Sequence, residues 1–145
     1  MVILKEVNDE NFYKLVKMER QEHVAPNVFS IAQAYLFPEM KPRAIYNKEN
    51  ELVGFVMYGP DPDLNDQIWI WRLSIDTPYQ RKGYGRATVK KVIENVLEEY
   101  PEEKQLWLGT NPENERAIKF YTSLGFKDSG KTAYDNEKVF VYNLK

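Results

Sequence analysis

Two glycines, Gly83 and Gly85, stand among basic residues where an apolar run of the sequence gives way to an amphipathic one. Glycine lets the backbone adopt conformations that a side chain forbids, and it lets a ligand approach closely. The first amides of a helix that starts here have no partner within the helix, and the helix dipole adds partial positive charge. Arg81, Lys82 and Arg86 add formal charge. This combination predicts a binding site for a pyrophosphate group.

Two better-known phosphate motifs do not fit this segment. A dinucleotide-binding fingerprint needs a third glycine, and Thr88 stands at that position. A Walker loop needs Gly-Lys followed by Ser or Thr, which the chain lacks. Taken alone, the two glycines fit a simple turn with solvated basic residues as well as they fit a phosphate site.

The elements that must position this loop follow from hydrophobic periodicity and turn residues. Asp9 and Ser30 are the expected caps of the first two helices, and Gly125 is the expected residue just after the last one. Strands are expected at 2–7, 44–46, 52–58, 68–75, 106–108, near 126 and at 139–144, and helices at 11–22, 30–35, 85–100 and 114–124. This order predicts a mixed α/β fold, with a central and largely antiparallel sheet flanked by helices, in one domain over residues 1–145.

Composition narrows the possible functions. The chain has 145 residues and a formal net charge of −2, without the basic patch of a nucleic-acid binder. It has no cysteine, which excludes disulfides, thiolate metal sites and a cysteine nucleophile, and no metal site is predicted. No apolar stretch is long enough for a membrane span. These features fit a cytoplasmic protein without a nucleic-acid or membrane partner.

A second motif follows the loop about thirty residues later. Gln80-x-x-Gly83-x-Gly85 with Arg86-Ala87 resembles the coenzyme A pyrophosphate signature of the GCN5-related N-acetyltransferase (GNAT) superfamily. The segment from Asn111 through Asn114, Ala117, Phe120-Tyr121 and Leu124-Gly125-Phe126 resembles the second signature of that family. The resemblance implies a single-domain GNAT fold, acetyl-CoA as the cofactor, and direct transfer of an acetyl group to a primary amine.

The resemblance also implies which residues hold the cofactor. In the family, the strand before the loop splays from the next parallel strand, and the pantetheine arm pairs with backbone groups in the gap. Asn114 matches a residue that commonly contacts the cofactor, although an asparagine there is equally a helix cap. The implied cofactor residues are Leu73, Ser74, Ile75, Gln80, Arg81, Lys82, Gly83, Tyr84, Gly85, Arg86 and Asn114.

Tyr121 matches the usual general acid of the family. The alternative role for this residue is that of a core tyrosine on an amphipathic helix. A thiol has a pKa of about 8.5 and a tyrosine of about 10, so full proton transfer to the leaving thiolate is uphill by roughly 2 kcal/mol. Tyr121 is therefore expected to assist through a hydrogen bond that strengthens as charge develops.

The acceptor amine needs a base, because an alkylamine with a pKa of about 10.4 is almost fully protonated near neutral pH. Related bacterial spermine/spermidine acetyltransferases often carry a carboxylate where this chain has Trp71. That departure puts a base on this strand in doubt. Glu22 is the catalytic candidate instead, acting through water, and its neighbour His23 is more simply explained as an exposed residue at a helix end.

A closer resemblance concerns the acceptor. Val24–Asn27, Pro42–Tyr46 and Val53–Gly59 are similar to the polyamine-type acetyltransferases of Gram-positive bacteria, which implies a small polyamine or diamine substrate. Aromatic faces can hold a cation, although core packing or a homodimer contact also explains the tryptophans. Two alternative functions remain. One is acetylation of a protein or peptide amine, and the other is a non-catalytic acyl-CoA sensor. The implied substrate residues are Glu22, Asn27, Tyr35, Trp69 and Trp71.

Overall fold

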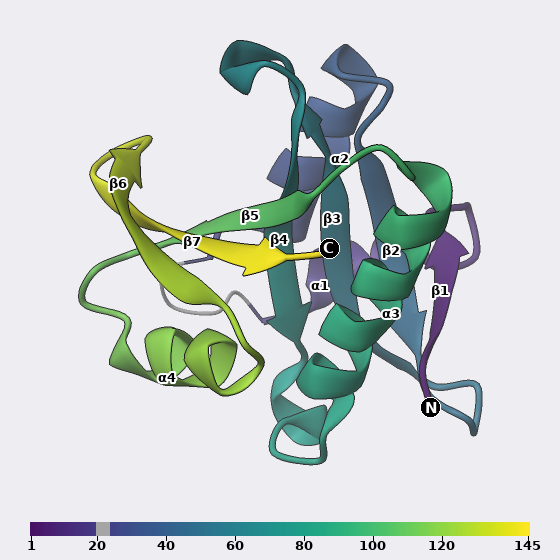
Figure 1. Cartoon of the computed structure of the whole chain (residues 1–145). Helices are drawn as coiled ribbons and strands as arrows, with labels where there is room; N and C mark the ends of the chain where they lie inside the picture. The colour runs from purple at the N-terminus through teal and green to yellow at the C-terminus, as the bar shows by residue number, and fades with distance from the viewer. Residues whose placement is uncertain (20–23) are drawn as a thin grey trace.

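The computed structural model describes residues 1–19 and 24–145. Seven strands of this described chain form one sheet, in the order β1-β2-β3-β4-β5-β7-β6 (Figure 1). Every neighbouring pair is antiparallel except β4 with β5, as the sequence predicts. The strands are β1 (Ile3–Glu6), β2 (Lys41–Tyr46), β3 (Leu52–Asp61), β4 (Gln67–Ile75), β5 (Gln105–Thr110), β6 (Lys127–Ala133) and β7 (Glu137–Asn143).

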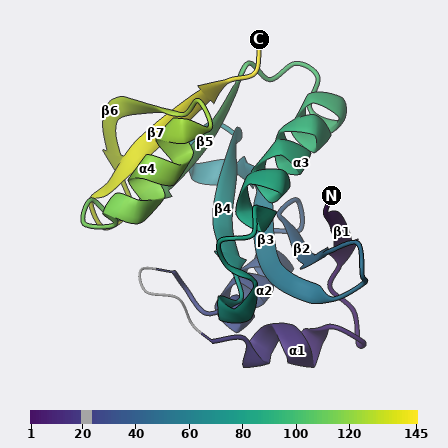
Figure 2. The ribbon, with the colours of Figure 1, turned by 90° about the horizontal axis from the view of Figure 1, so that it is seen from below.

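Helices cover both faces of the sheet. Helices α1 (Phe12–Lys17) and α2 (Asn27–Leu36) pack on one face, whereas α3 (Tyr84–Glu99) and α4 (Glu115–Ser123) pack on the other (Figure 2). The two short 3₁₀ turns Pro62–Leu64 and Thr77–Tyr79 lie on either side of β4. None of the described helices is long and apolar enough to cross a membrane. The result is the predicted mixed α/β architecture, with a largely antiparallel sheet flanked by helices.

The face under α3 and α4 holds the larger core. Val89, Val92 and Val96 lie one helical turn apart on α3 and are fully buried against β3, β4 and β5. Each such valine contributes roughly 1.5–3 kcal/mol by leaving water. The face under α1 and α2 holds a smaller cluster built around Leu15, Phe55 and Met57. The sheet therefore separates two apolar layers. Successive side chains of a strand point to opposite faces of the sheet, so neighbouring residues of a regular strand enter different layers.

Two predicted helix caps are wrong. Asp9 is exposed, and the N-cap of α1 is Asn11, whose side-chain oxygen instead accepts the backbone amide of Asn8 at 2.9 Å. The N-cap of α2 is Pro26, four residues before the predicted Ser30, so Ser30 lies buried inside the helix. Both errors follow from ranking cap residues by type, whereas the turn before each helix decides which residue takes the position.

Candidate active site

The parallel strands β4 and β5 separate within the sheet. They pair only from Ile68 to Ile70 on β4, and beyond that point β4 pairs with β3 alone while β5 pairs with β7 (Figure 2). The register of β4 against β3 shifts at the same place, because Met57 faces Arg72 and Tyr58 faces Ile70. Trp71 is thus the extra residue of a β-bulge, a device that bends a strand and re-aims its side chains. The bulge and the divergence give β4 an open edge.

Backbone groups of β4 face this open edge. The carbonyl of Ser74 lies against Gly54 of β3, only 2.4 Å from where a Cβ would stand on that glycine. Because backbone groups alternate in direction along a strand, the amide and carbonyl of Leu73 point the other way, toward the divergence. The Ile75 carbonyl accepts a hydrogen bond from Gln80 Nε2 at 2.9 Å. The side chains of Leu73 and Ile75 pack into the core under α3.

The loop after β4 leads into the start of α3. Gly83 has a φ of +87° and is the N-cap of the helix, with no side chain capping its first amides. Arg81, with a φ of +63°, and Lys82 are both exposed. A left-handed residue followed by uncapped helix amides forms a concave anion-binding surface. Tyr84 OH accepts a hydrogen bond from Asn47 Nδ2 at 3.3 Å, which ties the start of α3 to the sheet.

Gly85 and Arg86 join this loop to α4. A Cβ on Gly85 would lie 3.3 Å from the ring of Phe120, so glycine here lets α3 and α4 approach closely. Arg86 Nη2 donates to Ser123 Oγ at 3.0 Å near the end of α4. The family resemblance implied these two residues only as cofactor contacts. The structure gives each a packing role as well.

Helix α4 positions both residues of the second motif. Asn114 caps the helix, since its Oδ1 accepts the amide of Ala117 at 3.1 Å, and its side-chain nitrogen has no hydrogen bond to a described residue.

Tyr121 on α4 is half-buried. The centroid of its ring lies 5.0 Å from that of Phe120 and 5.6 Å from that of Phe126. Burial raises the pKa of Tyr121 above its ordinary value of 10.0. Gly125 ends the helix with a φ of +104°, as predicted.

On the opposite face of the sheet, aromatic rings gather beside the divergence. Trp69, Trp71 and Tyr134 lie with their ring centroids 6.1–6.3 Å apart. Trp69 is only 3% exposed, so it belongs to the core, and core packing was the alternative that the sequence left open for the tryptophans. Trp71 is half-buried and donates to the Gly59 carbonyl, and Tyr134 donates its hydroxyl hydrogen to the buried Asp61. Tyr134, from the turn between β6 and β7, belongs to this aromatic cluster, and the sequence did not reveal it.

The remaining predicted substrate residues are spread out. Asn27 lines a small pocket of about 120 Å³, together with Ser74 and residues of the segment after α1, and it donates to the Leu15 carbonyl at 2.7 Å. Tyr35 is 86% exposed on α2. Glu22 and His23 lie outside the described residues, so the role of Glu22 stays a prediction.

Four buried side-chain polar atoms of the described chain have no hydrogen-bond partner, and they come from only two elements. Helix α2 supplies two of them and β4 supplies the other two. They are Ser30 Oγ, Gln33 Oε1, Trp69 Nε1 and Arg72 Nε. Buried polar groups are nearly always satisfied, so these four atoms on the α2 side of β4 are donors and acceptors with hydrogen-bonding capacity left for a polar ligand or water.

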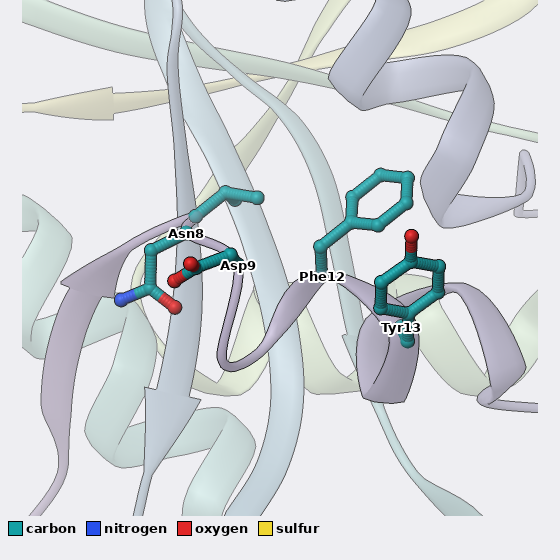
Figure 3. A pocket seen from close by; sticks show the side chains of 5 residues that line it. Asn8, Asp9, Phe12 and Tyr13 are labelled. Atoms are coloured by element: carbon teal, nitrogen blue, oxygen red, sulfur yellow. The ribbon is translucent and has the colours of Figure 1, made fainter.

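A second hollow lies at the turn before α1. Its volume is about 360 Å³, and Figure 3 shows Asn8 and Asp9 on the turn before α1 beside the rings of Phe12 and Tyr13. None of the predicted site residues lines it. Among the described residues, no group of three or more His, Asp and Glu side chains is arranged to hold a metal ion.

Comparison with known proteins identifies the class to which this fold and divided sheet belong. A model of the acetyltransferase (GNAT) family matches residues 6–126, and the chain belongs to that family. An acetyltransferase of the GNAT family from Staphylococcus aureus Mu50 superimposes with a TM-score of 0.70 at 19% identity, over 100% of both chains.

Curated relatives narrow the class further. The spermine/spermidine N(1)-acetyltransferase of Bacillus subtilis (strain 168) is 37% identical over 109 residues, 72% of this chain and 70% of that protein. The ribosomal protein bS18-alanine N-acetyltransferase of Escherichia coli (strain K12) is 34% identical over 64 residues, 44% of this chain and 42% of that protein. The chain is thus an N-acetyltransferase with homology to the spermine/spermidine enzymes.

Proposed function

We propose that this N-acetyltransferase uses acetyl-CoA to acetylate a primary amine of a polyamine or diamine. In the net reaction, an alkylammonium and an acetyl thioester give an N-alkylacetamide, a free thiol and one proton. The observation that carries the proposal is the divergence of β4 from β5 directly before an uncapped, glycine-started helix. One side of the divergence offers backbone and helix amides, and the other offers aromatic rings and a buried carboxylate.

The residues at the divergence fit coenzyme A. The Leu73 amide and carbonyl are available on the open edge of β4 for an amide-containing pantetheine arm. The uncapped amides after Gly83, with Arg81 and Lys82 exposed beside them, suit a pyrophosphate. The free side-chain nitrogen of Asn114 is a further donor on the α4 side. Acetyl-CoA would supply the electrophilic carbonyl and the leaving thiolate.

Tyr121 suits the role of a hydrogen-bond donor to the leaving group. The raised pKa keeps its hydroxyl protonated at neutral and mildly alkaline pH. The same shift makes complete transfer of its proton to a thiolate still less favourable than for an ordinary tyrosine. Tyr121 therefore stabilises developing charge on sulfur without having to ionise.

The opposite face suits a cationic acceptor. Trp71 and Tyr134 present aromatic surface. Burial raises the pKa of the Tyr134 hydroxyl, and the neighbouring Asp61 and Asp63 raise it further. Aromatic faces and carboxylates both attract ammonium groups. The 37% identity to a spermine/spermidine N(1)-acetyltransferase supports a polyamine in this position.

A protein amine is the second candidate. It is favoured by the 34% identity to an enzyme that acetylates an alanine of ribosomal protein bS18. That segment covers less than half of either chain, whereas the polyamine relative covers more than two thirds of both. The polyamine proposal therefore has the broader support.

Release of free thiol from acetyl-CoA, measured with a panel of amines, tests the proposal. Spermine, spermidine and short diamines should give thiol release, with the acetylated amine identified by mass spectrometry. Release with a peptide amine alone would support a protein amine as the substrate in place of a polyamine. Tight acetyl-CoA binding without release by any amine would indicate a sensor.

A further inference from the structure

Glu137 is the first residue of β7. It lies on the face of the sheet that carries Trp69, Trp71 and Tyr134, which is called the acceptor face below because the acceptor is proposed to bind there. Side chains alternate along the strand, so Glu137 shares its face with Val139 and Val141, which pack against Trp69 and Trp107. Phe140 points to the other face, into the core beneath α3 and α4. Glu137 and Tyr121 thus lie on opposite faces of the divided sheet.

The carboxylate of Glu137 lies directly over the divergence. Leu108 is the last residue of β5 that pairs with β4, and Gly109 is the first that does not. A Cβ on Gly109 would stand only 2.7 Å from Glu137 Oε1. The φ of Gly109 is not in the left-handed region, so its backbone alone does not require glycine. A side chain at position 109 would displace this carboxylate.

Arg72 of β4 lies close enough to Glu137 to act on its carboxylate electrostatically. Its Nη1 donates to the Trp71 carbonyl at 2.6 Å, its guanidinium carbon lies 5.9 Å from the centre of the Phe29 ring, and its Nε is buried without a partner. Among the described residues, the charged groups that act on Glu137 are Arg72 and Asp135 of the β6–β7 turn. Helix α2, which covers this face, carries no charged side chain.

We propose that Glu137 accepts the proton that the acceptor ammonium must lose before its nitrogen can attack. This inference rests on the proposed function and adds the base that the sequence left unassigned. In the step, one N–H bond of the ammonium breaks, its electron pair stays on nitrogen, and an O–H bond forms on Glu137. The protonated carboxyl then releases its proton to solvent, which accounts for the one proton of the net reaction.

The electrostatics of the pair suit this transfer. Burial raises the pKa of Glu137 above its ordinary value, Arg72 lowers it, and Asp135 raises it, with a net upward shift. A higher carboxyl pKa narrows the gap to the pKa of an alkylammonium, which is about 10.4. The buried Arg72 cation also disfavours a second positive charge beside it, so it lowers the pKa of an amine bound there.

Glu137→Gln tests the inference, with the exposed Glu102→Gln as its matched control. At neutral pH kcat should fall about a hundredfold or more in Glu137→Gln, within the usual range for a lost general base. The deficit should shrink as pH rises, because solution then supplies the neutral amine. Acetyl-CoA affinity measured by calorimetry should stay unchanged in both variants, and Glu102→Gln should keep full activity.

Gly109→Ala is a second test that moves the carboxylate without removing it. Its kcat should fall, and adding it to Glu137→Gln should cause little further loss, since both changes affect one group. Binding supplies an independent readout. Diamine affinity for the CoA-free protein should weaken as pH falls through the pKa of Glu137 and its carboxylate loses charge, a dependence that Glu137→Gln should lack.

The outcomes separate the two proposals. Thiol release by the wild type together with full activity, an unchanged pH profile and unchanged diamine binding in Glu137→Gln would overturn the role of Glu137 alone. A large loss in Glu22→Gln beside a normal Glu137→Gln would assign the base to Glu22. Absence of thiol release from the wild type with every amine would overturn both proposals.

Discussion

Tyr121 shows how one side chain can be both a core residue and a candidate acid. Its ring packs between Phe120 and Phe126, which holds the residue in place, and the same burial raises the pKa of its hydroxyl. The sequence presented packing and catalysis as alternatives. The structure makes them compatible, because a fixed hydroxyl that stays protonated is what a hydrogen-bond donor requires.

Tyr121→Phe should lower kcat roughly ten- to a thousandfold, a loss near the lower part of the range for general acid catalysis. The ring and its packing remain, so acetyl-CoA affinity and the midpoint of urea unfolding should change little. Because the pKa of Tyr121 is raised, wild-type kcat should not fall on the alkaline side up to about pH 10. Full kcat in the variant would leave Tyr121 with a packing role only.

At the scale of elements, the start of α3 is the feature that the sequence predicted best. Glycines between a strand and an amphipathic segment predict a loop from local sequence alone, and the positive φ of Gly83 agrees with that prediction.

The residues of the acceptor face were harder to predict. Tyr134 and Glu137 lie beside β4 only because β7 inserts between β5 and β6, an order that no local pattern encodes. The predicted cap of α1 was wrong for a related reason. The side-chain oxygens of Asn8 and Asn11 each accept the other residue's backbone amide, and residue type alone does not predict this turn.

Gly83→Val should weaken acetyl-CoA binding at least tenfold, or about 1.4 kcal/mol, when measured by calorimetry. A side chain at this helix start would crowd the anion site. Gly130→Val on β6 is the matched control, because Gly130 also has a positive φ of +78° and open space around it. Both variants should lose a similar amount of stability, since a non-glycine residue in the left-handed region costs roughly 1–2 kcal/mol. Equal acetyl-CoA affinities in the two variants would show that the loop is only a turn.

The whole molecule carries a formal net charge of −2, too small to select a partner by itself. What matters is the distribution of charge across the sheet. Basic residues flank the start of α3, whereas Asp61, Asp63 and Glu137 lie near the residues proposed to bind the acceptor. An anionic cofactor and a cationic acceptor would therefore approach from different sides and meet at the divergence of β4 and β5.

Salt should raise the KM for spermidine, because added ions screen its several charges from carboxylates beyond about 8 Å at physiological ionic strength. A simple alkylamine, which has one charge and an apolar tail, serves as the control and should show a weaker dependence. Initial rates measured over a range of salt concentrations give both slopes. Equal slopes would argue against recognition of the distal ammonium groups by charge.

A crystal structure with coenzyme A bound tests the central claim most directly, since the whole account depends on where that molecule lies. The account predicts the pyrophosphate on the amides that follow Gly83, and the pantetheine arm along the open edge of β4 with hydrogen bonds to Leu73. The sulfur should end between Tyr121 on one face and Glu137 on the other. A coenzyme A molecule bound elsewhere, with the divergence of β4 and β5 closed by side chains, would contradict the account.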